Sequence, residues 1–496
     1  MMLTDQAPAL IVVIPLMCAL LTPIIGLVKK ELCHIWVLFA LALSTAFAVS
    51  VLLAVISHGP VHYYMGGWMP PWGIEYVIDH LNALMLVLVT GTALVVAFYS
   101  PKSIERELPD KLTYFYTVFL LQVTGFLGIV ITGDVFNLYV FLEVASLAGY
   151  ALIAAGEEGA PLASFRYLIL GTIGACFYLI GAGYLYIVTG SLNMADLAAA
   201  LPELYHSKVI LVAFAFFMVG IALKMALFPL HMWLPDAYTK APSVASALIA
   251  PLMTKIAVYI MLRIMFTVFR PSFSFEILPV STIMVVTGIA AILVGAVMAL
   301  AQIDFKRMLC YIIVAEVGYM VGGIGLANET AIKGAILHVL NDVVMTLGLF
   351  AVAGIITYVK KSHNLSDFQG AFKKMPFTMA AFTVIGLSVI GVPPTCGFFS
   401  KWYLIQGSVI AGNWYFVAAL LFSSLINIVL FFRILEIGYY DQGDHGNQEK
   451  GAGRKFTEAP VSMLVPALFI AVLIILIGFY NQPIILGIIQ HSVPTL

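Results

Sequence analysis

The stretch FFMVGIALKMALFPLHMWLPDAYTKAP, residues 216–242, places a lysine and a proline inside one long apolar run. The apolar run is expected to start near residue 208. Lys224 lies about sixteen residues past that start, which puts it near the centre of a bilayer. An ammonium at that depth costs roughly 2.5–3.5 kcal/mol or more. Because Lys255, Lys401 and Glu143 lie in similar apolar runs, the sequence indicates a row of titratable groups that moves protons or cations across a membrane.

The composition excludes a water-soluble protein. The chain has 496 residues, of which 62% are hydrophobic and only 10% charged, whereas soluble domains carry about 25% charged residues. No basic patch suggests nucleic acid. The five cysteines are scattered without a CxxC pair, so we expect neither a disulfide framework nor a metal site. The first apolar run lacks a charged leader and a clear cleavage site, and we expect it to be retained as a span.

Apolar runs of about 20 residues, separated by polar or Gly/Pro-rich segments, predict fourteen membrane spans. Their approximate limits are 8–28, 33–57, 79–99, 111–131, 135–155, 161–188, 208–238, 243–267, 278–301, 305–325, 331–358, 374–411, 413–436 and 460–480. The runs 208–238 and 374–411 are too long for one straight crossing, and both contain internal prolines.

The positive charges test this count. Apart from the three lysines inside spans, most of the 24 Lys and Arg residues fall in alternate loops. Only Lys208, Arg263, Arg270 and Lys333 fall on the other side. A wrong number of spans would place Lys- and Arg-rich loops on both sides of the membrane. The positive-inside rule therefore predicts a multi-pass protein of the cell membrane with the lysine-rich loops in the cytoplasm and both termini outside.

A second interrupted run, IGLSVIGVPPTCGFFSKWYLI at 385–405, has the same character as the first. Pro229 in the first run, and Pro393 and Pro394 in the second, each remove a backbone donor and break or kink a helix. Interrupted segments in corresponding positions of two halves indicate inverted repeats and mark a transport site. The alternative, that two common proline kinks match by chance, stays open.

Glu143 lies roughly 12 Å into the span that starts near 135, close to the midplane. Beside a lysine this carboxylate would be ionised, and alone it would be neutral and bonded to a backbone carbonyl. Lys224 is too deep to extend its ammonium to the surface, whereas Lys255 and Lys401 leave that alternative open. Asp134 directly follows Gly133 and is expected to cap a helix.

His338, Asn341 and Asp342 lie three and four residues apart and therefore share one helix face. A histidine that titrates near neutrality suits a relay between lysines, and a purely structural histidine is the alternative. His231, just after Pro229, is interpreted equally well as functional or as a capping residue. No pattern of histidines or cysteines suits haem or an iron–sulfur cluster, so we expect no cofactor.

These residues resemble a known pattern, that of the antiporter-like membrane subunits shared by Mrp-type Na+/H+ antiporters, complex I and membrane-bound hydrogenases. The chain is most similar to the D-type subunits of the Mrp antiporters. The matching segments are GDVFNLYVFLEV (133–144), ALKMALFPLHMWLPDAYTKAPSVASALIA (222–250), PLMTKIAVY (251–259), DFKRMLCYIIVAEVGYM (304–320) and GVPPTCGFFSKWYLI (391–405). They cover both halves of the chain.

The resemblance implies an all-α membrane protein with about fourteen helices, two inverted five-helix repeats, and interrupted seventh and twelfth helices. The expected segments are an N-terminal three-helix segment at 1–105, a first repeat at 106–270, a second repeat at 271–440, and a C-terminal helix and tail at 441–496. It also implies a polar axis along the membrane midplane.

The resemblance assigns roles along this axis. Glu143 would pair with Lys224, Lys255 would connect the two halves, His338 would belong to the next relay, and Lys401 would be the distal lysine. The residues expected to support or gate the axis are His231, Asp342, Asn341, Pro229, Pro393 and Pro394.

Two positions depart from the family pattern. The family often has a lysine where this chain has Thr346, and often a second histidine where it has Asp342. These changes suggest that the weakest link lies between His338 and Lys401. They also suggest that Asp342 attracts a cation instead of relaying a proton.

We therefore expect a proton-translocating subunit of a multi-subunit monovalent cation/proton antiporter. Its expected partners are other membrane subunits, protons and Na+. The alternative is the pumping subunit of a redox-driven complex, such as a membrane-bound hydrogenase or a complex I relative, with the chemistry in partner subunits. In both cases no reaction of its own is expected. An inert scaffold is the third possibility.

Overall fold

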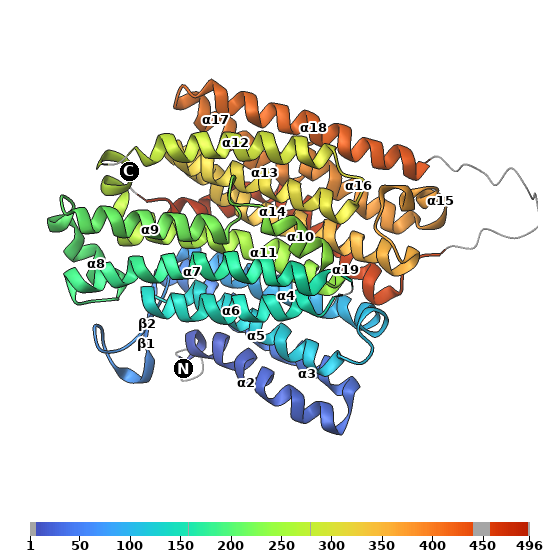
Figure 1. Ribbon diagram of the computed structural model, residues 1–496, viewed down its shortest axis with the longest axis horizontal. Helices are drawn as coiled ribbons and strands as arrows, with labels where there is room; N and C mark the ends of the chain where they lie inside the picture. The colour runs from blue at the N-terminus through green and yellow to red at the C-terminus, as the bar shows by residue number, and fades with distance from the viewer. Residues whose placement is uncertain (1–5, 157, 278, 440–456, 495–496) are drawn as a thin grey trace, which may run out of the picture.

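Long helices run side by side in one bundle in the computed structural model, which describes residues 6–156, 158–277, 279–439 and 457–494 (Figure 1). Twelve helices of the described chain are long and apolar enough to cross a membrane. They are α2 (Ala7–Val28), α3 (Lys30–His58), α4 (His80–Glu107), α5 (Leu112–Ile131), α6 (Val135–Ala154), α7 (Ala160–Thr189), α11 (Ser243–Leu262), α12 (Val280–Leu300), α13 (Phe305–Gly325), α14 (Glu329–Lys360), α18 (Trp414–Tyr439) and α19 (Val461–Phe479).

Two further crossings are interrupted helices. The first consists of α9 (Lys208–Lys224) and α10 (Trp233–Lys240), and the second of α16 (Pro376–Ile390) and α17 (Cys396–Ile410). With the continuous helices they give the fourteen crossings that the apolar runs predict. The interruptions fall in the seventh and twelfth crossings, as the family resemblance implies.

Each interruption has its own local cause. Helix α9 ends at Lys224, ahead of Pro229, and Ala226 adopts a positive φ of 57° in the turn that follows. The helix therefore stops earlier than the proline alone predicts. At the second interruption Gly391 closes α16 with φ 96°, a conformation that glycine adopts without the steric cost of a Cβ.

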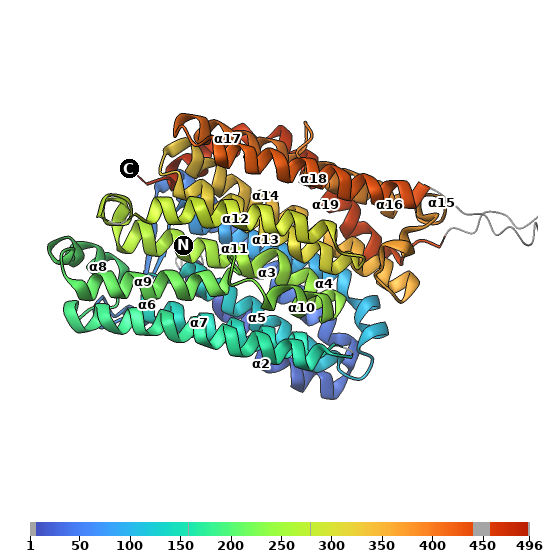
Figure 2. The same cartoon turned by 45° about the horizontal axis from the view of Figure 1, so that its top comes forward.

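Helices α11, α13 and α14 form the centre of the bundle. The most apolar stretch of each is 100% buried, compared with 33% in α2 and in α3. Figures 1 and 2 show these three helices running through the middle of the molecule. Any polar group on them must therefore be satisfied by a neighbouring helix rather than by lipid.

Matching hydrogen bonds relate the two halves. The equivalent backbone pairs are Val135 N to Leu192 O (2.9 Å) and Met194 N to Gly133 O (2.8 Å) in the first half, and Phe305 N to His363 O (2.8 Å) and Leu365 N to Ile303 O (2.9 Å) in the second. Asp134 caps α6, as predicted, and Asp304 caps α13 in the same way. The first set lies near α8 (Met194–Ala200) and the second near α15 (Ala371–Lys374), at opposite ends of the bundle (Figure 1). Inverted repeats require this arrangement.

Short elements cover the two ends of the bundle. Strands β1 (Val61–Tyr64) and β2 (Glu75–Ile78) form an antiparallel hairpin at the end where both chain termini lie (Figure 1). The other short helices are α8, α15, α20 (Asn481–Gly487), the 3-10 turns η1 (Met65–Gly67), η2 (Leu201–Leu204), η5 (Leu365–Phe368) and η6 (Ile489–Ser492), and the π-helical turns η3 (Arg263–Val268) and η4 (Ser272–Ile277). The boundary predicted at 440–441 lies outside the described residues.

Helices α12 and α13 approach each other through glycines. A Cβ on Gly288 would lie 2.8 Å from Cα of Gly322, and a Cβ on Gly295 would lie 2.7 Å from the backbone N of Ala315. Helices in lipid associate through such close backbone packing because water does not drive them together.

We expect Gly295→Leu to lower the thermal stability of the protein in detergent, because the new side chain separates α12 from α13. Gly183→Leu on α7 is the matched control, since a Cβ there meets nothing within 4 Å. Thermal unfolding followed by size-exclusion chromatography measures the difference. Equal unfolding temperatures for the two variants would contradict the packing described here.

Candidate functional site

Apart from Lys306 at the start of α13, six charged or histidine side chains are buried inside the membrane-spanning helices of the described chain. They are Lys224 on α9, Lys255 on α11, Glu316 on α13, His338 and Asp342 on α14, and Lys401 on α17, each no more than 6% exposed. Groups of this kind are rare in a bilayer and usually mark an ion or proton pathway. The fold thus gathers on its central and interrupted helices the residue types that the sequence singled out.

The first group contains Glu143 and Lys224. The Lys224 ammonium lies 3.9 Å from Oε1 of Glu143 and donates a hydrogen bond of 2.7 Å to Oγ of Ser146. Glu143 and Ser146 are three residues apart on α6 and therefore face the same side. Lys224 is the last residue of α9. The helix break thus presents the ammonium to α6, and the predicted proximity of Glu143 and Lys224 is observed.

The second group joins the two repeats at the centre of the molecule. The Lys255 ammonium lies 2.7 Å from Oδ2 of Asp342, with both side chains no more than 3% exposed. Thr346 donates a hydrogen bond of 2.9 Å to Oδ1 of the same carboxylate. The Lys255 ammonium therefore balances the charge of Asp342. A free cation at this carboxylate, as the sequence suggested, is not needed to account for its burial.

The third group contains a carboxylate that the sequence analysis missed. Glu316 Oε2 lies 2.5 Å from Nε2 of His338, and Nδ1 of the same ring lies 2.9 Å from Oγ of Ser400. Glu316 lies about eleven residues into the span that starts at 305, roughly 16 Å deep at 1.5 Å per residue. That depth, the signal that identified Glu143, would have identified it.

Lys401 has surroundings of a different kind. Its ammonium donates to the carbonyl oxygens of Val389 (2.6 Å) and Ile390 (3.4 Å) and lies 5.1 Å from the centre of the Tyr319 ring. The Tyr319 ring also packs against His338, with ring centres 5.3 Å apart. Tyr319 therefore lies between His338 and Lys401.

The departures noted in the sequence have a different consequence from the one expected. Thr346 binds Asp342 and does not lie between His338 and Lys401, where Ser400 and Tyr319 make the connection. The row is also interrupted on the other side of the centre. Among the described residues no hydrogen bond or ion pair joins Lys224 to Lys255, and the buried hydroxyl of Thr254 has no partner there.

The supporting residues lie at the two interruptions. His231 follows Pro229 in the first, where the residue is 5% exposed and its Nδ1 has no hydrogen-bond partner among the described residues. Asn341 donates to the carbonyl of Cys396 (2.8 Å), the first residue after Pro393 and Pro394 to enter α17. Asn341 therefore ties α14 to the second interruption.

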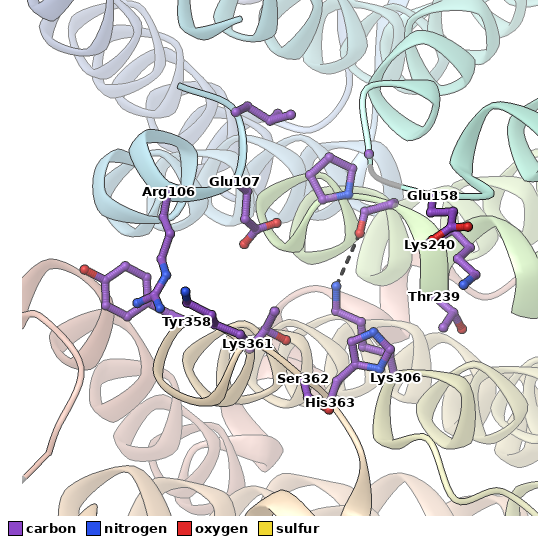
Figure 3. Close-up of a pocket in the computed structure, with 15 residues that line it drawn as sticks. Arg106, Glu107, Glu158, Thr239, Lys240, Lys306, Tyr358, Lys361, Ser362 and His363 are labelled. Atoms are coloured by element: carbon purple, nitrogen blue, oxygen red, sulfur yellow. Dashed lines mark hydrogen bonds between the residues drawn. The ribbon is translucent and has the colours of Figure 1, made fainter. Parts of the chain in front are cut away.

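A cavity of about 620 Å³ opens where the two repeats meet at the end of the bundle that carries α10 (Figure 3). Its charged lining residues are Arg106, Glu107, Glu158, Lys240, Lys306, Lys361 and His363. Glu107 accepts a hydrogen bond of 2.7 Å from the backbone N–H of Ser243, the first residue of α11. The cavity therefore ends at the start of the helix that carries Lys255.

The fold and the buried residues together define a polytopic ion-translocation subunit of the antiporter-like type. Residues 132–427 match the family described as NADH:quinone oxidoreductase/Mrp antiporter, TM. The chain belongs to this family.

Two curated relatives are similar over most of the chain. One is NADH-quinone oxidoreductase subunit N of Desulforudis audaxviator, which is 45% identical over 99% of both chains. The other is the D-type subunit of the Na(+)/H(+) antiporter of Alkalihalophilus pseudofirmus, which is 32% identical over 88% of this chain and 87% of the relative.

Solved structures show the same fold. A chain of the archaeal membrane-bound sulfane sulfur reductase superimposes with a TM-score of 0.88 at 29% identity, covering 98% of this chain and 96% of its own. A chain of the Mrp complex of a Dietzia species superimposes with a TM-score of 0.87 at 24% identity, covering 99% and 97%. Both of these chains come from structures of complexes.

We expect Asp342→Asn to destabilise the protein by up to about 3–5 kcal/mol, because it leaves the Lys255 ammonium buried without a counter-charge. The double variant Lys255→Met with Asp342→Leu removes both charges and should be closer to the wild type in stability. Unfolding of the purified protein in detergent compares them. A single variant as stable as the wild type would contradict the ion pair.

Proposed function

We propose that this chain is the proton-translocating subunit of a multi-subunit monovalent cation/proton antiporter. The observation that carries the proposal is the row of ionisable groups in the bundle. Glu143 pairs with Lys224, Lys255 with Asp342, and Glu316 with His338, and Lys401 follows them. In each pair the proton affinity of one group depends on the charge of the other. A proton that arrives at one pair therefore favours release from the next.

The exposure of Glu143, the first residue of the proposed row, indicates that a partner subunit covers it. Glu143 lies near mid-membrane, yet 24% of its side chain is exposed, whereas its partner Lys224 is 2% exposed. A carboxylate open to lipid at that depth is unfavourable. We infer that a neighbouring membrane subunit covers α6 at Glu143 and supplies a polar group there. In this proposal the chain contributes no redox chemistry or cofactor of its own.

The cavity beside α10 is the proposed entrance for protons. It is lined by acidic and basic side chains and ends at the first turn of α11, about 18 Å of helix from Lys255 at 1.5 Å per residue. The lysine-rich loops lie at this end, so we propose that it faces the cytoplasm and that both termini face outside, in the cell membrane. The buried, unpartnered hydroxyls of Thr254 and Tyr238 offer hydrogen-bonding sites for water along the way.

We expect Lys224→Ala and Glu143→Ala each to abolish Na+-dependent proton flux, because either change leaves the other charge without its partner. Flux is measured with a pH-sensitive dye in inverted vesicles that contain the complete complex. Glu105→Ala is the matched control, since Glu105 is an exposed carboxylate paired with Lys102 outside the row. Full flux in either test variant would refute the relay.

A second host is supported by the 45% identity to a relative named NADH-quinone oxidoreductase subunit N. In that case the same row of residues would pump protons in a redox-driven complex. Purification of the chain from its native membrane distinguishes the two hosts. Co-purifying iron–sulfur proteins, detected by electron paramagnetic resonance, would favour the redox complex, and small membrane subunits without clusters would favour the antiporter.

A further inference from the structure

Lys401 differs from Lys224 and Lys255, the other lysines deep inside the bundle, in having no carboxylate partner in the described part of the chain. Lys224 faces Glu143, and Lys255 faces Asp342. Within the described ranges Lys401 forms no ion pair, and the nearby carboxylates Glu316 and Asp342 are engaged by His338 and Lys255. The Lys401 ammonium is held by uncharged oxygens instead.

Those oxygens come from the end of a half-helix and from one hydroxyl. The ammonium lies 2.6 Å from the carbonyl oxygen of Val389, 3.4 Å from that of Ile390 and 3.4 Å from Oγ of Ser424 on α18. Val389 and Ile390 are the last two residues of α16. The final carbonyls of a helix lack intrahelical donors and carry the negative end of the helix dipole.

The sequence keeps these two carbonyls without backbone donors. In a continuous helix the N–H groups of residues 393 and 394 would bond to the carbonyls of Val389 and Ile390. Both positions are proline, which has no N–H. The consecutive prolines therefore do more than interrupt the helix, because they leave two buried oxygens available for a cation.

Gly391 makes room for the occupant. Its φ of 96° turns the chain away from α16, and a Cβ at this position would lie 3.2 Å from Cδ of Lys401. The aromatic face of Tyr319 lies on another side of the ammonium, 5.1 Å from ring centre to Nζ. Carbonyl oxygens, a hydroxyl and an aromatic face all attract a cation without adding a negative charge.

We propose that these oxygens form a site for a small monovalent cation, which Lys401 occupies as a tethered ammonium. When Lys401 gives its proton to the relay, whose neighbouring member is His338 across Tyr319, the neutral amine leaves the carbonyls, and Na+ takes its place with the same single positive charge. One proton leaves for each cation that enters, so the two ions exclude each other at one set of oxygens. This inference rests on the proposed antiporter function and supplies its coupling step.

The ligand set favours a monovalent ion. Unwound backbone carbonyls and half-helix C-termini coordinate Na+ in transporters with interrupted helices. Calcium and magnesium sites in proteins usually include carboxylates, and no carboxylate contacts this position in the described structure. Ser424 is only half-buried, so the site lies near the lateral surface of the bundle at α18.

The test is equilibrium binding of radioactive Na+ to the purified complex over a range of pH. In the wild type the apparent Kd for Na+ should rise about tenfold for each pH unit lowered while Lys401 is protonated, because binding of the two ions is reciprocal. Lys401→Ala should bind Na+ with little dependence on pH. Lys401→Arg should bind none, because a guanidinium stays charged.

Further variants separate this site from the relay and from folding defects. Lys401→Gln serves as a second neutral variant if Lys401→Ala does not fold, and Ser424→Ala should weaken Na+ binding several-fold. Gln406→Ala, at an exposed position on α17, is the matched control. Glu143→Ala should keep pH-dependent Na+ binding while losing proton flux, so failure of the relay and failure of this site give different results.

The proposal is overturned if folded Lys401→Ala and Lys401→Gln bind no more Na+ than Lys401→Arg at any pH. It is also overturned if Ca2+ displaces Na+ at equal concentration, because that result requires a carboxylate-containing site. Binding that depends on pH equally in the wild type and in both neutral variants would assign the competition to another residue.

Discussion

The structure depends on the cost of placing a charge where there is no water. The three lysines deep in the bundle are each stabilised by specific partner groups that offset this cost. Lys224 has Glu143 and Ser146, Lys255 has Asp342, and Lys401 has the carbonyls of α16. The partners of each lysine lie on a different helix from the lysine itself, so these contacts constrain how the helices pack. The same pairing makes each group's proton affinity sensitive to its neighbour's charge, which links stability to transport.

The two repeats share a backbone plan but use their lysines differently. Equivalent hydrogen bonds next to Asp134 and Asp304 show the shared plan. In the first repeat the lysine ends the half-helix and faces a carboxylate on α6. In the second, Lys401 lies beyond the break and reaches back to the end of α16. The first half is thus suited to passing a proton between charges, and the second to exchanging a proton for a cation.

Much of the fold could be predicted from the sequence because lipid imposes a simple rule on composition. Apolar runs give the fourteen crossings, and prolines give the two interruptions. The pairing of Lys255 with Asp342 could not be predicted, because it depends on how α11 and α14 cross, which periodicity within one helix does not record. Glu316 could have been predicted from its depth alone, as Glu143 was. Thr346 was associated with the link between His338 and Lys401, whereas its hydrogen-bond partner is Asp342, one turn away on the same helix.

The proposed relay requires the row of buried groups to be continuous through the second repeat. The decisive measurement is proton flux in vesicles that contain the complete complex, with Glu316→Gln compared against Glu436→Gln, a change at an exposed carboxylate of the same repeat. We predict that flux is lost in Glu316→Gln, because His338 then has no carboxylate to take up its proton, and is unchanged in Glu436→Gln. Wild-type flux in folded Glu316→Gln would show that the row is not the proton path.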